Sequence, residues 1–140
     1  MIILDTNVLS EVLKPAPSEH VLGWLAAQEP SEVFITTVTQ AEVLYGIEIL
    51  PAGERRTRLS GAVAEIFAQD FAGRILPFDE EAAHLFPQIV ANRERAGRPI
   101  SQFDALIASC ARFRRAAIAT CNTADFEGCG IRIVNPWTAE

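Results

Sequence analysis

Four acidic side chains stand where the neighbouring sequence gives them no obvious partner. Glu42 and Asp104 lie in stretches with helical periodicity, and neither has a cationic residue three or four positions away. Asp5 directly follows a short apolar run, and Asp125 lies a few residues after another. An ionised carboxylate among apolar neighbours is costly unless another group compensates its charge. These four residues are therefore the candidates for chemistry.

Each of these acids also has a structural explanation when it is taken alone. Asp104 can interact with the helix dipole from the first turn of its helix, and Asp5 can form a turn after a strand. Glu42 can be partly exposed or paired with an arginine that the fold brings close, and Asp125 can begin a helix. An ordinary surface acid looks different: Glu94 has an arginine four residues further on, which predicts an exposed ion pair.

If the four acids share one pocket, their mutual repulsion must be balanced. Two carboxylates about 5 Å apart repel each other by about 3 kcal/mol at an effective dielectric constant near 20. A divalent cation reverses the sign of this interaction. Ligands that are all oxygen atoms favour Mg²⁺, with Mn²⁺ as a substitute, over Zn²⁺. Such a site supports the attack of water on a phosphodiester.

The elements that must position these acids alternate along the chain between short apolar strands and helices. Strands are expected at 2–4, 33–35, 74–76, 116–119 and 131–134. Helices are expected at 19–28, 38–50, 52–71, 79–96 and 102–114, with caps at Ser18, Thr37, Asp79 and Ser101. Helix 38–50 is apolar on nearly every face, which predicts burial. The absence of hairpin signals predicts an α/β fold in which helices cover both faces of a parallel sheet.

In a sheet of this kind, ligands bind beyond the carboxyl ends of the strands. Asp5 stands at that end of the first strand. Asn122 and Asp125 emerge at the same edge if the strand before them runs parallel to the first. The topology therefore predicts that residues from both ends of the chain meet in one place.

Length and composition indicate one domain over residues 1–140. The chain contains no apolar run long enough to cross a membrane, and its first residues lack the basic region of a secretory signal, so a cytoplasmic location is expected. Its three cysteines match neither a zinc site nor a disulfide framework, which predicts reduced thiols.

The charge balance is acidic, with 12 basic against 18 acidic side chains and a formal charge of −6. Domains that hold nucleic acid by bulk charge usually have a pI above about 9, so this mode of binding is not expected. Arginines nevertheless gather at 55–58, 93–98 and 112–115. Because a guanidinium binds phosphate through a fixed bidentate fork, small basic patches can coexist with an acidic whole.

The acidic motifs resemble those of PIN-domain ribonucleases, and most of all the VapC and FitB type of toxin from bacterial type II toxin-antitoxin systems. The resemblance rests on their order and spacing over nearly the whole chain. Stretches 71–79 and 135–137 are similar to the FitB branch. The motifs are Ile3-Leu4-Asp5-Thr6-Asn7, Thr39-Gln40-Ala41-Glu42, Asp104-Ala105-Leu106-Ile107-Ala108, and Thr120 with Asn122 and Asp125-Phe126.

The resemblance implies a three-layer α/β/α sandwich with a central, mainly parallel sheet of four or five strands. It also implies Mg²⁺-dependent endonucleolytic cleavage of RNA, with Asp5, Glu42 and Asp104 as core metal ligands. Some FitB-like sequences have aspartate where this chain has Asn122, so Asp125 is expected to complete the site directly or through water. Supporting or water-positioning roles fall to Thr6, Asn7, Thr120 and Asn122.

The implied partners are an RNA substrate, a second copy in a homodimer and a VapB- or FitA-like antitoxin. The antitoxin would wrap the toxin, block its acidic site and join it in a higher assembly that contacts promoter DNA only through the antitoxin. No membrane is implied. Arg93, Arg95 and Arg98, just before the helix of Asp104, are candidate contacts for RNA or for the antitoxin.

Two other functions are compatible with parts of the pattern. A phosphotransferase could use Asp5 as a nucleophile, but position 7 is Asn7 where the haloacid dehalogenase pattern has a second aspartate, and no lysine follows Lys14. A non-catalytic module could keep the acidic pocket as a docking site for a basic partner. Metal-dependent RNase activity that the Asp5→Asn substitution abolishes would exclude the second reading.

Overall fold

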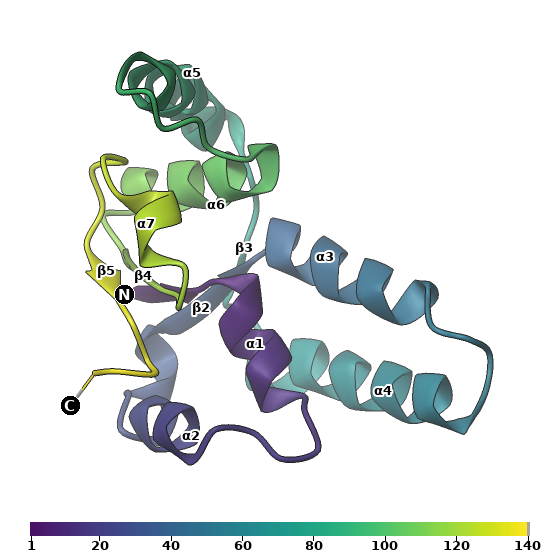
Figure 1. Ribbon diagram of the computed structural model, residues 1–140. Helices are drawn as coiled ribbons and strands as arrows, with labels where there is room; N and C mark the ends of the chain where they lie inside the picture. The colour runs from purple at the N-terminus through teal and green to yellow at the C-terminus, as the bar shows by residue number, and fades with distance from the viewer. Residues whose placement is uncertain (140) are drawn as a thin grey trace.

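A parallel sheet forms the centre of the molecule, as the computed structural model of residues 1–139 shows (Figure 1). In this described part of the chain, the sheet has five strands in the spatial order β3-β2-β1-β4-β5, and each neighbouring pair is parallel. The strands are β1 (Ile2–Leu4), β2 (Val33–Thr36), β3 (Ile75–Leu76), β4 (Ala117–Ala119) and β5 (Ile133–Val134). The first strand of the chain therefore lies in the middle of the sheet.

Helices cover both faces of this sheet. Figure 1 shows α5 and α6 on one side and α1, α2 and α4 on the other. The helices are α1 (Thr6–Val12), α2 (Glu19–Ala26), α3 (Thr37–Glu48), α4 (Glu54–Glu65), α5 (Glu80–Arg95), α6 (Gln102–Phe113) and the single turn α7 (Thr123–Phe126). A 3-10 turn (Pro30–Glu32) precedes β2, and a π-helical turn (Ile66–Asp70) continues α4. The expected three-layer α/β/α architecture is confirmed.

Successive strand residues build two separate cores, because side chains alternate between the faces of a sheet. Ile3 and Ile118 pack into the cluster that includes Ile107 of α6. Leu4 and Ala119, the next residue in each strand, belong to the opposite cluster. The short apolar runs are thus buried on both faces, as expected of parallel strands.

Side-chain caps fix the starts of several helices. The expected caps at Ser18, Asp79 and Ser101 are confirmed, since each side chain accepts a hydrogen bond from a backbone N–H in the first turn. The prediction for Thr37 was wrong by one residue. Thr36 caps α3 through a 3.2 Å bond from the N–H of Thr39, because β2 passes directly into α3 and the last residue of the strand serves as the cap.

The prediction that helix 38–50 is buried was also wrong. Only Val38, Thr39 and Val43 of α3 are buried. Leu44, Tyr45 and Ile49 are 49%, 66% and 64% exposed. Figure 1 shows why: α3 projects beyond the end of the sheet, so only part of its surface meets the core. Its exposed apolar side chains form a surface that a partner could cover.

No helix within residues 1–139 is both long enough and apolar enough to traverse a bilayer. Cys110, Cys121 and Cys129 are free thiols, as expected. Burial, as the largest cause, raises the pKa of Cys110 to about 11 and also raises that of Cys121 and Cys129, so these thiols stay protonated near neutral pH.

Candidate active site

The carboxyl ends of β1, β2 and β4 lie at one edge of the sheet because these neighbours are parallel. Asp5 follows β1 and Thr120 follows β4, while β2 leads directly into α3, which carries Glu42. Asp104 lies in the first turn of α6, and Asp125 lies on α7 after β4. The topology therefore directs every predicted acid toward this edge.

Asp5 is held by three hydrogen bonds. Its Oδ1 accepts from the N–H of Thr6 at 2.8 Å, which makes it the N-cap of α1. Its Oδ2 accepts from the hydroxyl of Thr120 at 2.8 Å and from Nδ2 of Asn7 at 3.1 Å. Only 4% of Asp5 is exposed. The carboxylate is fixed in orientation before any ligand arrives.

Thr120 connects Asp5 to the loop that precedes α7. Its oxygen accepts from Nδ2 of Asn7 at 2.9 Å and from the N–H of Asn122 at 3.0 Å. A hydroxyl has one proton to donate, and that proton goes to Asp5. The side chain of Asn122 is exposed, so this residue contributes to the network through its backbone.

Glu42 is held by a second pair of threonines. The hydroxyl of Thr6 donates to Oε1 of Glu42 at 2.8 Å and lies 3.0 Å from the hydroxyl of Thr39. Because the proton of Thr6 goes to Glu42, the proton between the two hydroxyls comes from Thr39. No role for Thr39 is predicted from the sequence, although its position three residues before Glu42 places both on one helix face.

The acids act on one another electrostatically. Burial raises the pKa of Asp5 to about 6, and the charges of Asp104 and Glu42 add to that rise, while the bonds from Thr120 and Thr6 oppose it. Burial and the charge of Asp125 raise the pKa of Asp104, whereas its Ser101 contact and the nearby Arg93 lower it. Each of the four predicted acids is thus repelled by the charge of at least one of the others.

The donor set can be compared with what a metal ion requires. Within the described residues, no three acidic, histidine or cysteine side chains stand close enough to enclose an ion on their own. Mg²⁺ does not require this, because it is commonly bound by one or two carboxylates and keeps several of its waters. A buried, oriented Asp5 with further carboxylates nearby fits a hydrated magnesium ion, whereas a closed zinc site would need more direct ligands.

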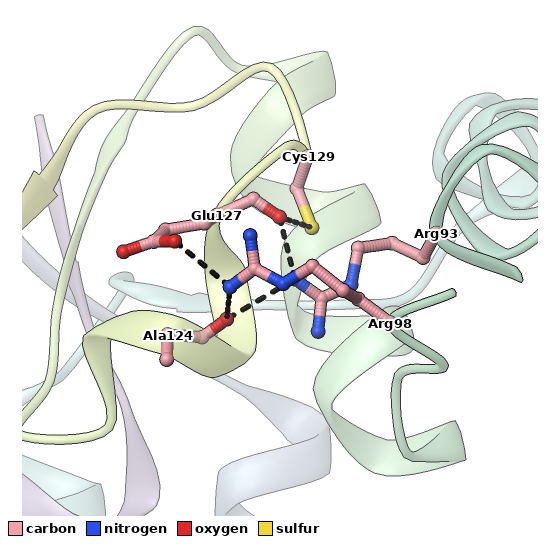
Figure 2. A network of polar contacts seen from close by, with 5 residues as sticks. All are labelled: Arg93, Arg98, Ala124, Glu127 and Cys129. Carbon is pink, nitrogen blue, oxygen red and sulfur yellow. Dashed lines mark hydrogen bonds and ion pairs between the residues drawn. The ribbon is translucent and has the colours of Figure 1, made fainter. Parts of the chain in front are cut away.

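The three arginines near α6 occupy different environments. Arg93 is only 6% exposed, and its guanidinium donates to the backbone carbonyls of Ala124 and Glu127 (Figure 2). This burial does not suit a surface contact with RNA or an antitoxin. Arg98 is exposed and pairs with Glu127 at 2.8 Å instead of the expected Glu94. Arg95 is exposed and bonds to the side chain of Asn92.

A cavity of about 610 Å³ opens beside Glu42, between α1, α3 and α4. Its apolar lining comes from α3, from α4 and from the segments that follow α1 and α3, and two arginines stand at its side. The lining residues include Val43, Ile47, Leu50, Arg55, Arg58 and Leu59. The groove is therefore continuous with the acidic edge through Glu42.

Comparisons with known proteins agree with this geometry. The sequence pattern of the PIN domain family matches residues 2–128. The chain is 37% identical over 137 residues to VapC ribonuclease Y4jK of Sinorhizobium fredii, covering 98% of each protein. It is 36% identical over 137 residues to toxin FitB of Neisseria gonorrhoeae, covering 98% of this chain and 99% of FitB.

The structural similarity is equally extensive. A solved structure of FitAB bound to an IR36 DNA fragment superposes with a TM-score of 0.95 at 36% sequence identity, covering 100% of this chain and 98% of the matched chain. Sequence, fold and the placement of the acids thus lead to the same assignment. The chain belongs to the PIN domain family and, within it, to the VapC and FitB type.

Proposed function

We propose that this chain is a Mg²⁺-dependent endoribonuclease toxin that hydrolyses RNA phosphodiester bonds in the cytoplasm until an antitoxin neutralises it. The observation that carries the proposal is the set of four mutually repelling acids at one sheet edge, with Asp5 oriented by three hydrogen bonds. The names of the relatives, a VapC ribonuclease and the toxin FitB, support the same activity.

Asp5, Glu42 and Asp104 would hold the ion, with Asp125 completing its surroundings directly or through water. A bound Mg²⁺ would supply charge neutralisation and acidify water for attack on the phosphodiester. Asn7 and Thr120 keep Asp5 in position through two bonds to Oδ2, while Oδ1 accepts only the bond from Thr6 and keeps acceptor capacity for the ion.

The threonine pair performs the same task for Glu42. Thr39 and Thr6 form a relay of hydroxyl groups that ends on Oε1, which leaves Oε2 of Glu42 for the ion or its waters. Because Thr6 follows Asp5 in the chain, one backbone turn sets the separation of the two acids. Orientation of this kind is an effective source of rate acceleration, because the groups need no rearrangement during the reaction.

We further propose that the antitoxin occupies the groove beside Glu42. In the solved structure that resembles this chain, FitAB is bound to a DNA fragment. The groove offers apolar walls from α3 and α4 and joins the acidic edge, so one bound segment could cover both. Arg95 and Arg98 stay candidates for RNA or antitoxin contact because both are exposed.

A homodimer would explain the exposed apolar side chains of α3. Tyr45 and Ile49 lie one helical turn apart and are 66% and 64% exposed. They project away from the groove-lining positions of the same helix, Val43 and Ile47. We therefore assign the groove to the antitoxin and the opposite face of α3 to a second copy.

The activity is tested by incubating the purified protein with total RNA, with and without Mg²⁺, and mapping the new RNA ends. Discrete ends that require the ion and disappear in Asp5→Asn are expected. Absence of cleavage at any Mg²⁺ or Mn²⁺ concentration, together with retained binding of a basic partner, would favour the docking-module reading. Mass spectrometry of the protein after incubation with phosphate donors excludes the phosphotransferase reading if Asp5 carries no phosphate.

A further inference from the structure

Two arginines from the end of α5 are brought together by a tight turn. The N–H of Arg98 donates to the carbonyl of Arg93 at 2.9 Å, and the N–H of Gly97 donates to that of Glu94 at 3.0 Å. This is the hydrogen-bond pattern of a Schellman motif. Gly97 has φ +71°, the left-handed conformation that glycine adopts without strain. The turn places both guanidinium groups over the same part of the fold.

That part is α7, the single helical turn that carries Asp125. Arg93 donates to the carbonyls of Ala124 at 3.1 Å and Glu127 at 2.6 Å. Arg98 donates to the same Ala124 carbonyl at 3.2 Å and to the carboxylate of Glu127 at 2.8 Å. Figure 2 shows the two guanidinium groups lying together against this segment. The arginines thus satisfy carbonyl groups that a helix end leaves without partners.

α7 has little to hold it otherwise. It is a four-residue helix without a side-chain hydrogen bond at its N-cap, and helices this short are not stable alone. Phe126 is fully buried and anchors one side of the turn. The buried ring of Phe126 fixes where α7 lies, but it does not fix how the helical turn is rotated about that ring. The bonds from Arg93 and Arg98 supply the second and third points of attachment.

The burial of Arg93 costs free energy that a purely structural role would not require. It is buried, no carboxylate of residues 1–139 lies within ion-pair distance of it, and its Nε has no hydrogen-bond partner there. Burying a charge without a close counter-charge is unfavourable, and an apolar side chain would pack at lower cost. The bonds that offset this cost go to α7, the turn that carries Asp125 to the acidic edge.

We propose that Arg93 is a positioning residue that holds α7 so that Asp125 stands beside Asp104. Arg98 supports the same turn from the exposed side. The inference rests on the proposed nuclease function for its kinetic consequence, but the placement of α7 can be measured without it. Arg93 touches neither substrate nor metal. Its charge also acts on Asp104, but its hydrogen bonds reach only α7 and the residue that follows it.

The first test measures hydrogen exchange in the metal-free protein. Arg93→Met removes the donors while keeping an unbranched apolar side chain, and Arg93→Lys keeps the charge with a single donor group. We expect exchange at residues 123–128 to rise by at least about tenfold in Arg93→Met and less in Arg93→Lys, since the lost bonds involve a charged donor. Arg132→Gln, which removes an exposed arginine outside α7, should leave exchange at 123–128 unchanged.

The second test is a double-mutant cycle on RNA cleavage. Arg93→Met should lower kcat by about 10- to 100-fold, the effect expected from losing hydrogen bonds to a charged group, with little change in KM. Asp125→Asn should lower kcat as well. If Arg93 acts through Asp125, the double variant will be no slower than the worse of the two single variants, because effects of groups that act as a unit are not additive.

Unchanged exchange at residues 123–128 in Arg93→Met would overturn the proposal. So would kinetic effects of Arg93→Met and Asp125→Asn that multiply, or a loss of activity in Arg93→Met when Asp125→Asn is fully active. If Arg93→Met does not fold, Arg93→Lys and Arg98→Gln carry both measurements. A wild-type protein without RNase activity would refute the proposed function, and the exchange result would then be interpreted on its own.

Discussion

The hydroxyl of Thr6 donates a 2.8 Å hydrogen bond to Oε1 of Glu42, 36 residues further along the chain. Thr6 also gives its backbone N–H to Asp5. One residue therefore binds two of the proposed metal ligands, through its backbone and through its side chain. Small changes at Thr6 should alter the relative position of the two carboxylates while leaving the fold intact.

Replacing Thr6 by valine tests this link. The Thr6→Val substitution preserves the shape of the side chain and removes the bond to Glu42, so we expect RNA cleavage to fall by about 10- to 100-fold, corresponding to the loss of a hydrogen bond to a charged group. Thr6→Ser keeps the hydroxyl and should retain most of the activity. Initial rates at saturating Mg²⁺ check both. Equal activity in the valine and serine variants would show that the hydroxyl is dispensable.

The raised pKa of Asp5 predicts how the metal-free protein responds to pH. An acid whose pKa is higher in the folded than in the unfolded state binds more protons when folded, so the free energy of unfolding falls as pH rises through the interval. For Asp5 that interval runs from 3.8 to about 6, and a shift of this size corresponds to about 3 kcal/mol. The Asp5→Asn variant has no ionisable group at this position, so its free energy of unfolding should not fall over this interval.

The measurement is urea unfolding in EDTA at pH 4 and at pH 7, for wild type and for Asp5→Asn. Relative to wild type, the variant should become more stable at pH 7 than at pH 4 by up to about 3 kcal/mol. The amide nitrogen of asparagine cannot accept a hydrogen bond, so at least one of the three bonds that Asp5 accepts is lost at both pH values, and this loss cancels in the comparison. A stability difference that does not change with pH would contradict a buried, ionised Asp5.

Mg²⁺ should stabilise the folded protein and raise its melting temperature. A ligand at 100 times its dissociation constant adds about 2.7 kcal/mol to the free energy of unfolding. Asp5→Asn and Asp104→Asn should each reduce this effect. Glu65→Gln, at an exposed position of α4, serves as the matched control. Scanning calorimetry with and without the ion would disprove the site if all four proteins melted alike under both conditions.

The groove between α1, α3 and α4 should bind the antitoxin. Leu59→Glu places a charge on its apolar wall and should prevent co-purification with a co-expressed antitoxin while the variant still cleaves RNA, because the acids are untouched. Leu22→Glu introduces the same charge at an exposed leucine of α2 and should leave the complex intact. Complex formation that survives Leu59→Glu but not Leu22→Glu would move the interface to α2.

The order of strands and helices was predictable because it depends on local patterns. Ile2–Leu4 and Ala117–Ala119 are apolar triplets, each followed by a polar residue. Short runs of this kind are typical of buried parallel strands. The caps at Ser18, Asp79 and Ser101 have the same local origin. Thr36 and Thr37 are identical side chains in adjacent positions, so the local pattern does not decide which of them caps α3. In the structure α3 begins at Thr37, directly after β2.

The environment of two segments depended on contacts that no local pattern contains. The sequence of α3 is as apolar as that of a core helix. A surface that binds a partner can have the same composition, so the sequence did not reveal that Tyr45 is exposed. Arg93 belongs by sequence to an exposed basic cluster. Its acceptors lie 31 and 34 residues further on, and only the tertiary fold brings them together. The acids, in contrast, could be identified because no nearby cation accounted for them.

The central place of β1 in the sheet has a consequence for biosynthesis. Asp5 is synthesised before the residue that orients it, because the hydroxyl that donates to it belongs to Thr120, 115 residues later. At about 5–20 residues per second, a nascent chain spends several seconds without its fourth strand and without a finished acidic edge. We therefore expect the proposed nuclease to stay inactive until the part of its own message that encodes Thr120 has been translated.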